Sequence, residues 1–373
     1  MPIGVEFLLI GMVTAVAAAL PGCFLVLRRV SLVADAISHA ILPGIVVAFF
    51  ITGDLSSPIL VLAAAATGVL TVVLIEALHR TGLVAEDAAV GLVFPALFSL
   101  GVILISRYAS GVHLDTDAVL LGDLAFAPFD RLVVSGVDLG PTSLWTMGGV
   151  LALNLLFVVL LYKELKLATL DPGLAALLGF SPGLLHHALM CLVSITAVGA
   201  FSAVGSVLVV ALMIAPPATA YLLADRLSAM LLLAAAAAAG SAALGERAAV
   251  TFDVSIAGGM ASAAGLVFAV TFLLAPRRGL LAQARRRARQ RVDFRLRMLL
   301  VHLLQHEAAG DADRECRTLE LYRHLRWSPS ATARVVRAGQ ERDLVSPAGP
   351  LLTLAPSGRR LAEAALVGDP LGN

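Results

Sequence analysis

An aspartate and a histidine stand four residues apart near the start of an apolar stretch. Asp35 and His39 lie in the run Ser31-Leu-Val-Ala-Asp35-Ala-Ile-Ser38-His39-Ala-Ile-Leu-Pro43-Gly44. On a helix, side chains four apart share one face, one turn from each other. A carboxylate and an imidazole so placed can ligate one divalent metal ion, because imidazole suits zinc and iron and carboxylate suits manganese. Ionisable groups within a membrane segment are costly, so each is a candidate for function.

Spacing alone leaves two interpretations of this pair open. The side chains of Asp35 and His39 could contact a metal ion, or they could form an ion pair that satisfies both groups between packed helices. Two ligands do not complete a coordination shell, so a metal would also need a second copy of the chain, another helix or water. Incomplete coordination suits a conduit, which the ion has to leave again. Ser38 stands beside the pair but is expected to point away from its face.

The elements that must position the pair are membrane helices. The chain has 373 residues, 59% of them apolar and 14% charged, against about 25% charged residues in an average soluble domain. This composition excludes a soluble monomer and a disordered chain. A helix needs about 20 apolar residues to cross a bilayer. We predict spans near residues 5–27, 32–52, 58–78, 88–106, 143–162, 184–203, 205–224, 227–245 and 254–275.

The break between the sixth and seventh spans is weak, so eight spans is the alternative. Only Gly199 and Gly205 mark that break. Cytoplasmic loops of membrane proteins are enriched in Lys and Arg. With nine spans, eight basic residues fall on one side and three on the other, which predicts an outer N-terminus and a cytoplasmic C-terminus. The outer side then holds acids such as Glu6 and Asp138, which could attract cations or could simply be polar loop residues.

Charge divides the chain into two regions. Residues 1–278 carry 11 Lys and Arg against 16 Asp and Glu, a net charge of −5. Residues 279–373 carry 16 Arg against 10 Asp and Glu, a net charge of +6. Such asymmetry indicates two regions in different surroundings. We therefore predict an all-α polytopic membrane domain at 1–278, a basic juxtamembrane linker at 279–291 and a small cytoplasmic α+β domain at 292–373.

Other ionisable residues of the membrane region give weaker signals. Glu76, His79 and Arg80 end a predicted span and are interpreted as a cytoplasmic anchor. The adjacent histidines 186 and 187 begin another span at the same face, where polar residues are ordinary. His113 stands in a long acidic outer loop, where it could meet an incoming ion or simply be solvated.

A short segment between the fifth and sixth spans predicts a capped helix. It reads Asp171-Pro172-Gly173-Leu-Ala-Ala176-Leu-Leu-Gly179. Asp171 is a good N-cap and Pro172 suits the first helical position, while Gly179 is placed to end the helix. A capped helix isolated in a cytoplasmic loop indicates a docking element for a soluble partner. The sequence has no Gly-x4-Gly-Lys-Ser/Thr pattern, so ATP binding through a Walker motif is excluded.

Three segments together carry a resemblance to a known family. They are Asp35-Ala-Ile-Ser-His39-Ala-Ile-Leu-Pro-Gly, Glu86-Asp87-Ala-Ala-Val-Gly91 and Val204-Gly205-Ser-Val-Leu-Val-Val-Ala-Leu-Met-Ile-Ala-Pro216-Pro-Ala-Thr-Ala220. With the loop at 171–179, they make residues 1–278 resemble the membrane permease of ABC importers for manganese, zinc and iron. The segments are specific as an ordered set, whereas each alone is a weak signal.

This resemblance implies transport rather than catalysis. It implies a permease in the bacterial cell membrane, paired with a second permease as a homodimer or with a sister subunit, and an external metal-binding protein. It implies a separate ATPase docked at Asp171, Pro172, Ala176 and Gly179, and it maps Asp35 and His39 onto intramembrane metal contacts. The cargo is expected to be Mn²⁺, with Zn²⁺ or Fe²⁺ as alternatives, and no permanently bound cofactor is expected.

The C-terminal region predicts a second kind of module. Arginines at 285–291 would attract anionic membrane lipids at about 1 kcal/mol each. Helices are expected near 292–308, 314–325 and 329–342, then two strands within 343–354 and a last helix from 355. This is a winged helix-turn-helix order, and it resembles the DNA-binding domain of iron- and manganese-dependent repressors.

That second resemblance implies a candidate recognition helix. Arg334, Arg337 and Arg342 lie on it and could contact nucleic-acid phosphate. A regulatory or partner-docking role is the favoured alternative, because membrane tethering makes gene regulation awkward. For the whole chain, two further alternatives are a membrane-tethered metal-responsive transcription regulator and a membrane-embedded metalloenzyme, although the latter lacks a His-Glu-x-x-His pattern.

Overall fold

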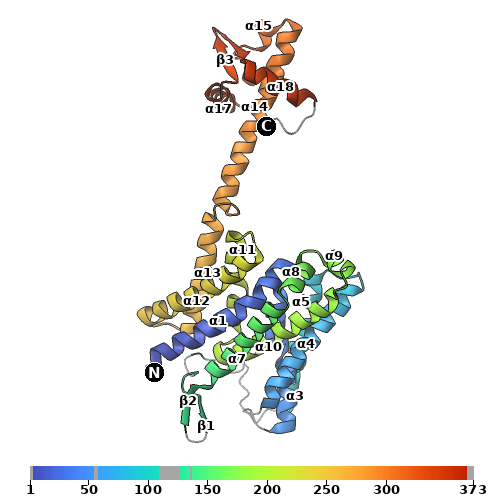
Figure 1. Cartoon of the computed structure of the whole chain (residues 1–373), viewed down its shortest axis with the longest axis vertical. Helices are drawn as coiled ribbons and strands as arrows, with labels where there is room; N and C mark the ends of the chain where they lie inside the picture. The colour runs from blue at the N-terminus through green and yellow to red at the C-terminus, as the bar shows by residue number, and fades with distance from the viewer. Residues whose placement is uncertain (1–2, 54–57, 109–123, 125–126, 135–136, 368–373) are drawn as a thin grey trace. The chain divides into compact units, whose positions relative to one another are not determined.

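The chain is mainly helical and divides into two compact units. The computed structural model describes residues 3–53, 58–108, 124, 127–134 and 137–367. The first unit covers residues 1–279 and the second covers residues 280–373. Figure 1 labels most of the helices and strands of the two units.

Within the described residues, the first unit contains nine helical stretches that are long and apolar enough to cross a membrane. This agrees with the nine spans predicted from hydropathy. They are α1 (Ile3–Arg28), α2 (Leu32–Ala40) together with α3 (Leu42–Thr52), α4 (Pro58–Arg80), α5 (Glu86–Tyr108), α7 (Thr142–Leu160), α10 (Pro182–Val204), α11 (Ser206–Leu223), α12 (Leu227–Phe252) and α13 (Ile256–Leu274). Shorter elements connect them: β1 (Arg131–Val134), β2 (Val137–Pro141), α8 (Tyr162–Leu170) and α9 (Pro172–Leu177).

Two backbone features interrupt the long helices. Gly205 separates α10 from α11 with φ +84° and ψ 160°, a conformation that glycine adopts without steric cost. The weak break in the sequence is therefore a real helix boundary. The other interruption, between α2 and α3, falls at Ile41. Pro43 has no N–H to donate to the carbonyl of His39, which disrupts the regular helix just after the Asp35–His39 pair.

Helices of the first unit pack closely around α1. Helix α1 contacts α7, α10, α11 and α12. Helices α4 and α5 contact each other, and both contact α2 and α3. At the crossing of α3 and α4, a Cβ on Gly44 would lie 2.0 Å from Thr67 Oγ1, so the crossing requires a residue without a side chain. Buried Asn154 of α7 donates to the Ala17 carbonyl of α1 at 2.8 Å and to Thr196 of α10 at 3.0 Å. Such bonds link membrane helices by satisfying polar groups within the bundle.

The second unit has its own hydrophobic core. Its elements are α14 (Leu280–Ala309), α15 (Ala312–Glu315), α16 (Leu321–His324), α17 (Pro329–Glu341), β3 (Val345–Ala348), β4 (Leu351–Leu354) and α18 (Pro356–Val367). Leu296, Leu299, Leu300 and Leu303 form one buried stripe of α14, with the spacing typical of an amphipathic helix. This stripe packs with buried residues of α16, α17, β3, β4 and α18. Strands β3 and β4 pair antiparallel.

Two details of the second unit differ from the expected elements. The arginine-rich stretch and the helix expected at 292–308 form one continuous helix, α14. The helix expected at 314–325 is instead two short helices, α15 and α16, with a bridge between Arg317 and Leu351. The Leu352 N–H also donates to the Cys316 carbonyl at 2.9 Å. Pairing with β4 takes these backbone groups away from a helix, which explains the split.

Candidate functional site

Asp35 and His39 lie on the same face of α2, as their spacing predicts. The distance from His39 Nε2 to Asp35 Oδ1 is 3.6 Å, and the side chains are 32% and 44% exposed, respectively. A contact of 3.6 Å is too long for a hydrogen bond. Two donors that share a tetrahedral ion at about 2.1 Å each would lie roughly 3.4 Å apart. The separation therefore fits both interpretations of the pair, a shared metal ion and an Asp–His ion pair.

The surroundings of the pair are aromatic on one side and open on the other. The ring of His39 lies 5.9 Å from the ring of Phe94 and 6.4 Å from that of Phe98, both on α5. Sequence reasoning did not name these phenylalanines, because aromatic residues in an apolar span give no distinctive signal. Buried Ser38 donates to the Ala34 carbonyl at 3.0 Å, which fits the expectation that it points away. Among the described residues, the pair gains no third His, Cys, Asp or Glu to form a three-ligand group.

The loop helix α9 begins as its sequence predicts. The carboxylate of Asp171 accepts a hydrogen bond from the Leu174 N–H at 2.9 Å, and Pro172 occupies the first helical position. This cap satisfies one of the backbone donors that a helix leaves unpaired at its start. A helix of six residues is too short to be stable by itself, so its shape depends on such caps.

The end of α9 is fixed by glycine. Gly179 has φ +87°, its N–H donates to Ala176 at 3.1 Å, and the N–H of Phe180 donates to Ala175 at 3.0 Å. These two bonds form a Schellman motif. The surface of α9 and its end is apolar, because Leu174, Leu177 and Leu178 are 44%, 86% and 62% exposed. Exposed apolar patches of this kind mark interaction surfaces.

Polar residues from two distant parts of the sequence, on α4 and α10, line one cavity. A cavity of about 240 Å³ is lined in part by Val33 of α2, Glu76 and His79 of α4 and His186 of α10. Glu76 pairs with Arg80 at 2.5 Å and with His187 at 3.1 Å. The carboxylate is therefore balanced by two neighbours, which fits the interpretation of this group as an interfacial anchor.

Two acids assigned to the outer side are paired. Arg131 of β1 lies 3.4 Å from buried Glu6 of α1 and 2.6 Å from Asp138 of β2. The Gly140 N–H and Arg131 lower the pKa of Asp138. These pairs favour a structural role for both acids over attraction of cations. His113 lies outside the described residues.

The three arginines of the candidate recognition helix differ in their contacts. Arg334 and Arg337 are exposed on α17. Arg342, which caps the end of that helix, pairs with Asp293 of α14 at 2.7 Å. Arg334 also donates from Nε to the Ser330 carbonyl of its own helix at 3.3 Å, so Arg342 is the one of the three that pairs with another helix of the second unit.

The membrane unit coincides with a known family. Residues 3–275 match the model of the ABC 3 transport family. The chain belongs to this family. It is 48% identical over 361 residues to the zinc transport system membrane protein TroD of Treponema pallidum, covering 97% of this chain and 98% of TroD. It is 45% identical to the manganese transport system membrane protein MntD of Bacillus subtilis, covering 73% of this chain and 92% of MntD.

A solved structure agrees with the family assignment. The chain is similar to a chain of PsaBC from Streptococcus pneumoniae in complex with Fab, with a TM-score of 0.61 and 30% identity over 73% of this chain and 92% of that one. This ABC 3 transport protein therefore has the ABC permease fold in its membrane unit. The alignment with TroD covers 97% of this chain, so it must include most of the second unit, residues 280–373. The second unit is therefore shared with at least one relative.

Proposed function

We propose that this chain is the membrane permease of an ATP-driven importer that carries a divalent transition metal into the cytoplasm. The observation that carries the proposal is an ABC 3 transport domain whose α2 presents Asp35 and His39 together. Relatives are named as zinc and manganese transport system membrane proteins. A permease of this kind is a transport subunit rather than an enzyme, and ATP is hydrolysed by a separate partner.

Asp35 and His39 act as transient metal contacts in this proposal. Their 3.6 Å separation and partial exposure let both side chains reach one ion from the surface of the unit. A second permease, identical or a sister subunit, supplies the facing wall, and an external metal-binding protein delivers the ion. Incomplete coordination by one chain favours passage, because a tightly enclosed ion would not leave.

The helix α9 is the proposed contact for the ATPase. Its ends are fixed by the Asp171 cap and the Gly179 turn. Leu177 and Leu178 offer an apolar surface that a partner would cover. Docking on a rigid, capped helix lets movement of the ATPase be transmitted to α8 and α10, which both contact α9.

Manganese is the expected cargo, because the segment from Ser38 to Gly44, with its Pro43, resembles the manganese and iron members of the family more than the zinc members. The names of the relatives include zinc, manganese and chelated iron. Uptake of radioactive manganese in competition with unlabelled zinc and ferrous iron identifies the cargo. Manganese is supported if unlabelled manganese, added as a third competitor, reduces uptake of the label at a lower concentration than zinc or ferrous iron does.

Uptake by cells that express the chain with its ATPase and binding protein tests the proposal. Asp35→Ala and His39→Ala are expected to reduce radiolabelled metal uptake to background while the complex still assembles. Ser38→Ala is the matched control, because it removes a polar group of the same helix whose hydroxyl is bonded to the Ala34 carbonyl. Full uptake by both pair variants would contradict the assigned path.

For the second unit, we propose a winged-helix module with a regulatory or partner-docking role. Support comes from α17, whose N-cap Ser328 accepts from Ala331, and from the β3–β4 hairpin with the added bridge at Arg317. We assign docking rather than nucleic-acid binding because Arg342 is paired with Asp293. Arginines 285–291 of α14 would lie against anionic lipid.

A further inference from the structure

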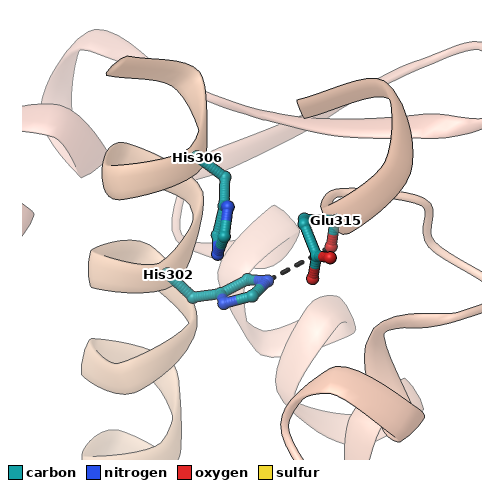
Figure 2. A group of neighbouring side chains, drawn as sticks. All are labelled: His302, His306 and Glu315. Carbon is teal, nitrogen blue, oxygen red and sulfur yellow. Dashed lines mark hydrogen bonds between the residues drawn. The ribbon is translucent and has the colours of Figure 1, made fainter. Parts of the chain in front are cut away.

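The second unit contains a group of metal-ligating side chains that transport does not use. His302, His306 and Glu315 form this group, with one ligand atom from each lying within 4.8 Å of the others among the residues that the structure describes (Figure 2). The two histidines are one turn apart on α14, and Glu315 is the last residue of α15. All three are half-buried, so an ion could reach them while being partly shielded from water.

Neighbouring groups orient both histidine rings. His306 Nδ1 lies 2.8 Å from Asp311 Oδ1. A carboxylate only accepts, so Nδ1 carries the proton and Nε2 keeps its lone pair for an ion. His302 Nε2 lies 3.1 Å from the Glu315 carbonyl oxygen, the contact drawn in Figure 2. Metal-binding histidines commonly donate their second ring nitrogen to a carboxylate or backbone carbonyl in this way.

The third ligand, Glu315, is also held by a neighbouring side chain. Glu315 Oε2 lies 2.7 Å from His324 Nδ1, which holds the carboxylate in place. His306 and Glu315 therefore each have a partner outside the group, and His302 is held by the backbone carbonyl of Glu315.

We propose that His302, His306 and Glu315 bind one divalent transition-metal ion in the second unit. Two imidazoles and one carboxylate form a donor set that suits Zn²⁺ with an open fourth position and also suits Fe²⁺. Water or an exchangeable ligand fills the remaining position. Cys316 follows Glu315 but is buried and does not belong to this group of side chains.

The bound ion would fasten two parts of the second unit together. The histidines belong to α14, whereas Glu315 immediately precedes the segment that bridges to β4 at Leu351. An ion at this position therefore links the core helix to the strand pair. The site shares no residue with the Asp35–His39 pair, so it extends the proposed function and does not depend on it.

Metal binding to the full chain tests the proposal. The protein is purified in detergent with Asp35→Ala and His39→Ala in place, so that the transport pair contributes no ligand. After treatment with a chelator, it is titrated with ZnCl₂, with MnCl₂ and with anaerobic FeCl₂, and retained metal is counted after desalting. We expect one ion per chain with at least one of these metals.

Single substitutions then locate that ion. His306→Gln and Glu315→Gln are each expected to weaken binding by about tenfold or more, and Glu341→Gln, which alters an exposed acid of α17, is expected to leave it unchanged. Circular dichroism confirms that each variant is folded. Visible absorption of the Co²⁺-loaded chain should change in both ligand variants. Binding that is equally tight in both folded ligand variants, or no binding of any of these ions to the parent chain, would overturn the proposal.

Discussion

The Asp35–His39 pair and the His302–His306–Glu315 group start from the same helical spacing and differ in their neighbours. Each places two potential ligands four residues apart on one helix, α2 in the first unit and α14 in the second. Beside His39 lie the rings of Phe94 and Phe98, which offer no ligand. Beside His306 lies Asp311, and beside Glu315 lies His324.

This difference shows how one spacing can serve two purposes. Partners in the outer shell orient ligands and raise metal affinity, so a surrounded group retains its ion. A pair that presents two ligands at a partly exposed surface can contact an ion and release it. The turn from Asp35 to His39 would thus let a metal ion pass in the first unit, whereas the turn from His302 to His306 would help to retain one in the second.

The largest expected effect comes from disrupting the core beneath the three-ligand group. Leu299→Ala removes a fully buried side chain of α14, which costs about 2–5 kcal/mol and raises the opened fraction of the second unit roughly 30-fold to 4,000-fold. Cys316 reports this opening, because burial raises its thiol pKa to about 11 and leaves little thiolate in the closed state. We expect maleimide labelling of Cys316 to accelerate accordingly at neutral pH.

The control for this measurement keeps the same helix and the same substitution. Leu281→Ala truncates an exposed leucine of α14 and should leave the labelling rate unchanged. Cys23→Ala and Cys191→Ala in all variants leave Cys316 as the single thiol, since the chain has three cysteines. Equal labelling rates in Leu299→Ala and the control would show that the side chain of Leu299 does not keep the second unit closed around Cys316.

A smaller effect is expected from removing one outer-shell partner. Asp311→Ala takes away the carboxylate that lies 2.8 Å from His306 Nδ1, and loss of such partners typically weakens metal affinity about 10-fold to 100-fold. Asp313→Ala, an exposed acid of the same short helix, should change the affinity little. Titration of the full chain with ZnCl₂ measures both. If Asp311→Ala and Asp313→Ala bind zinc equally well, outer-shell partners do not explain why the three-ligand group would retain an ion that the Asp35–His39 pair would release.

Much of the fold follows from the sequence because the bilayer fixes the length of a spanning helix. Apolar stretches of about 20 residues predicted the nine candidate spanning helices found among the described residues, and glycine marked the boundary at Gly205. Local cap chemistry likewise predicted both ends of α9 around Asp171 and Gly179. These features depend on neighbouring residues in the chain, so a single sequence contains the necessary information.

Features that depend on distant partners were not predictable in this way. The helix expected at 314–325 is divided because Arg317 pairs with Leu351. No local sequence pattern predicts this pairing. His302 and His306 have the spacing of Asp35 and His39, yet they stand in a polar helix where histidine is inexpensive, so the signal of a costly membrane group is missing. Glu315 joins them only because the chain turns between α14 and α15.

The smallest expected effect lies at a third position, remote from both sets of ligands. Asp171→Ala removes the N-cap of α9, which costs about 1 kcal/mol and should lower coupled metal uptake roughly fivefold if the capped helix is the ATPase contact. Asp171→Asn should preserve uptake, because asparagine caps as well as aspartate does. Zinc retention by the second unit should be unchanged in both variants, since α9 belongs to the first unit. A loss in the asparagine variant as large as that in the alanine variant would mean that the carboxylate charge, and not the cap, makes the contact. Uptake at the parent level in both would remove α9 from the coupling path and leave the ATPase to dock elsewhere.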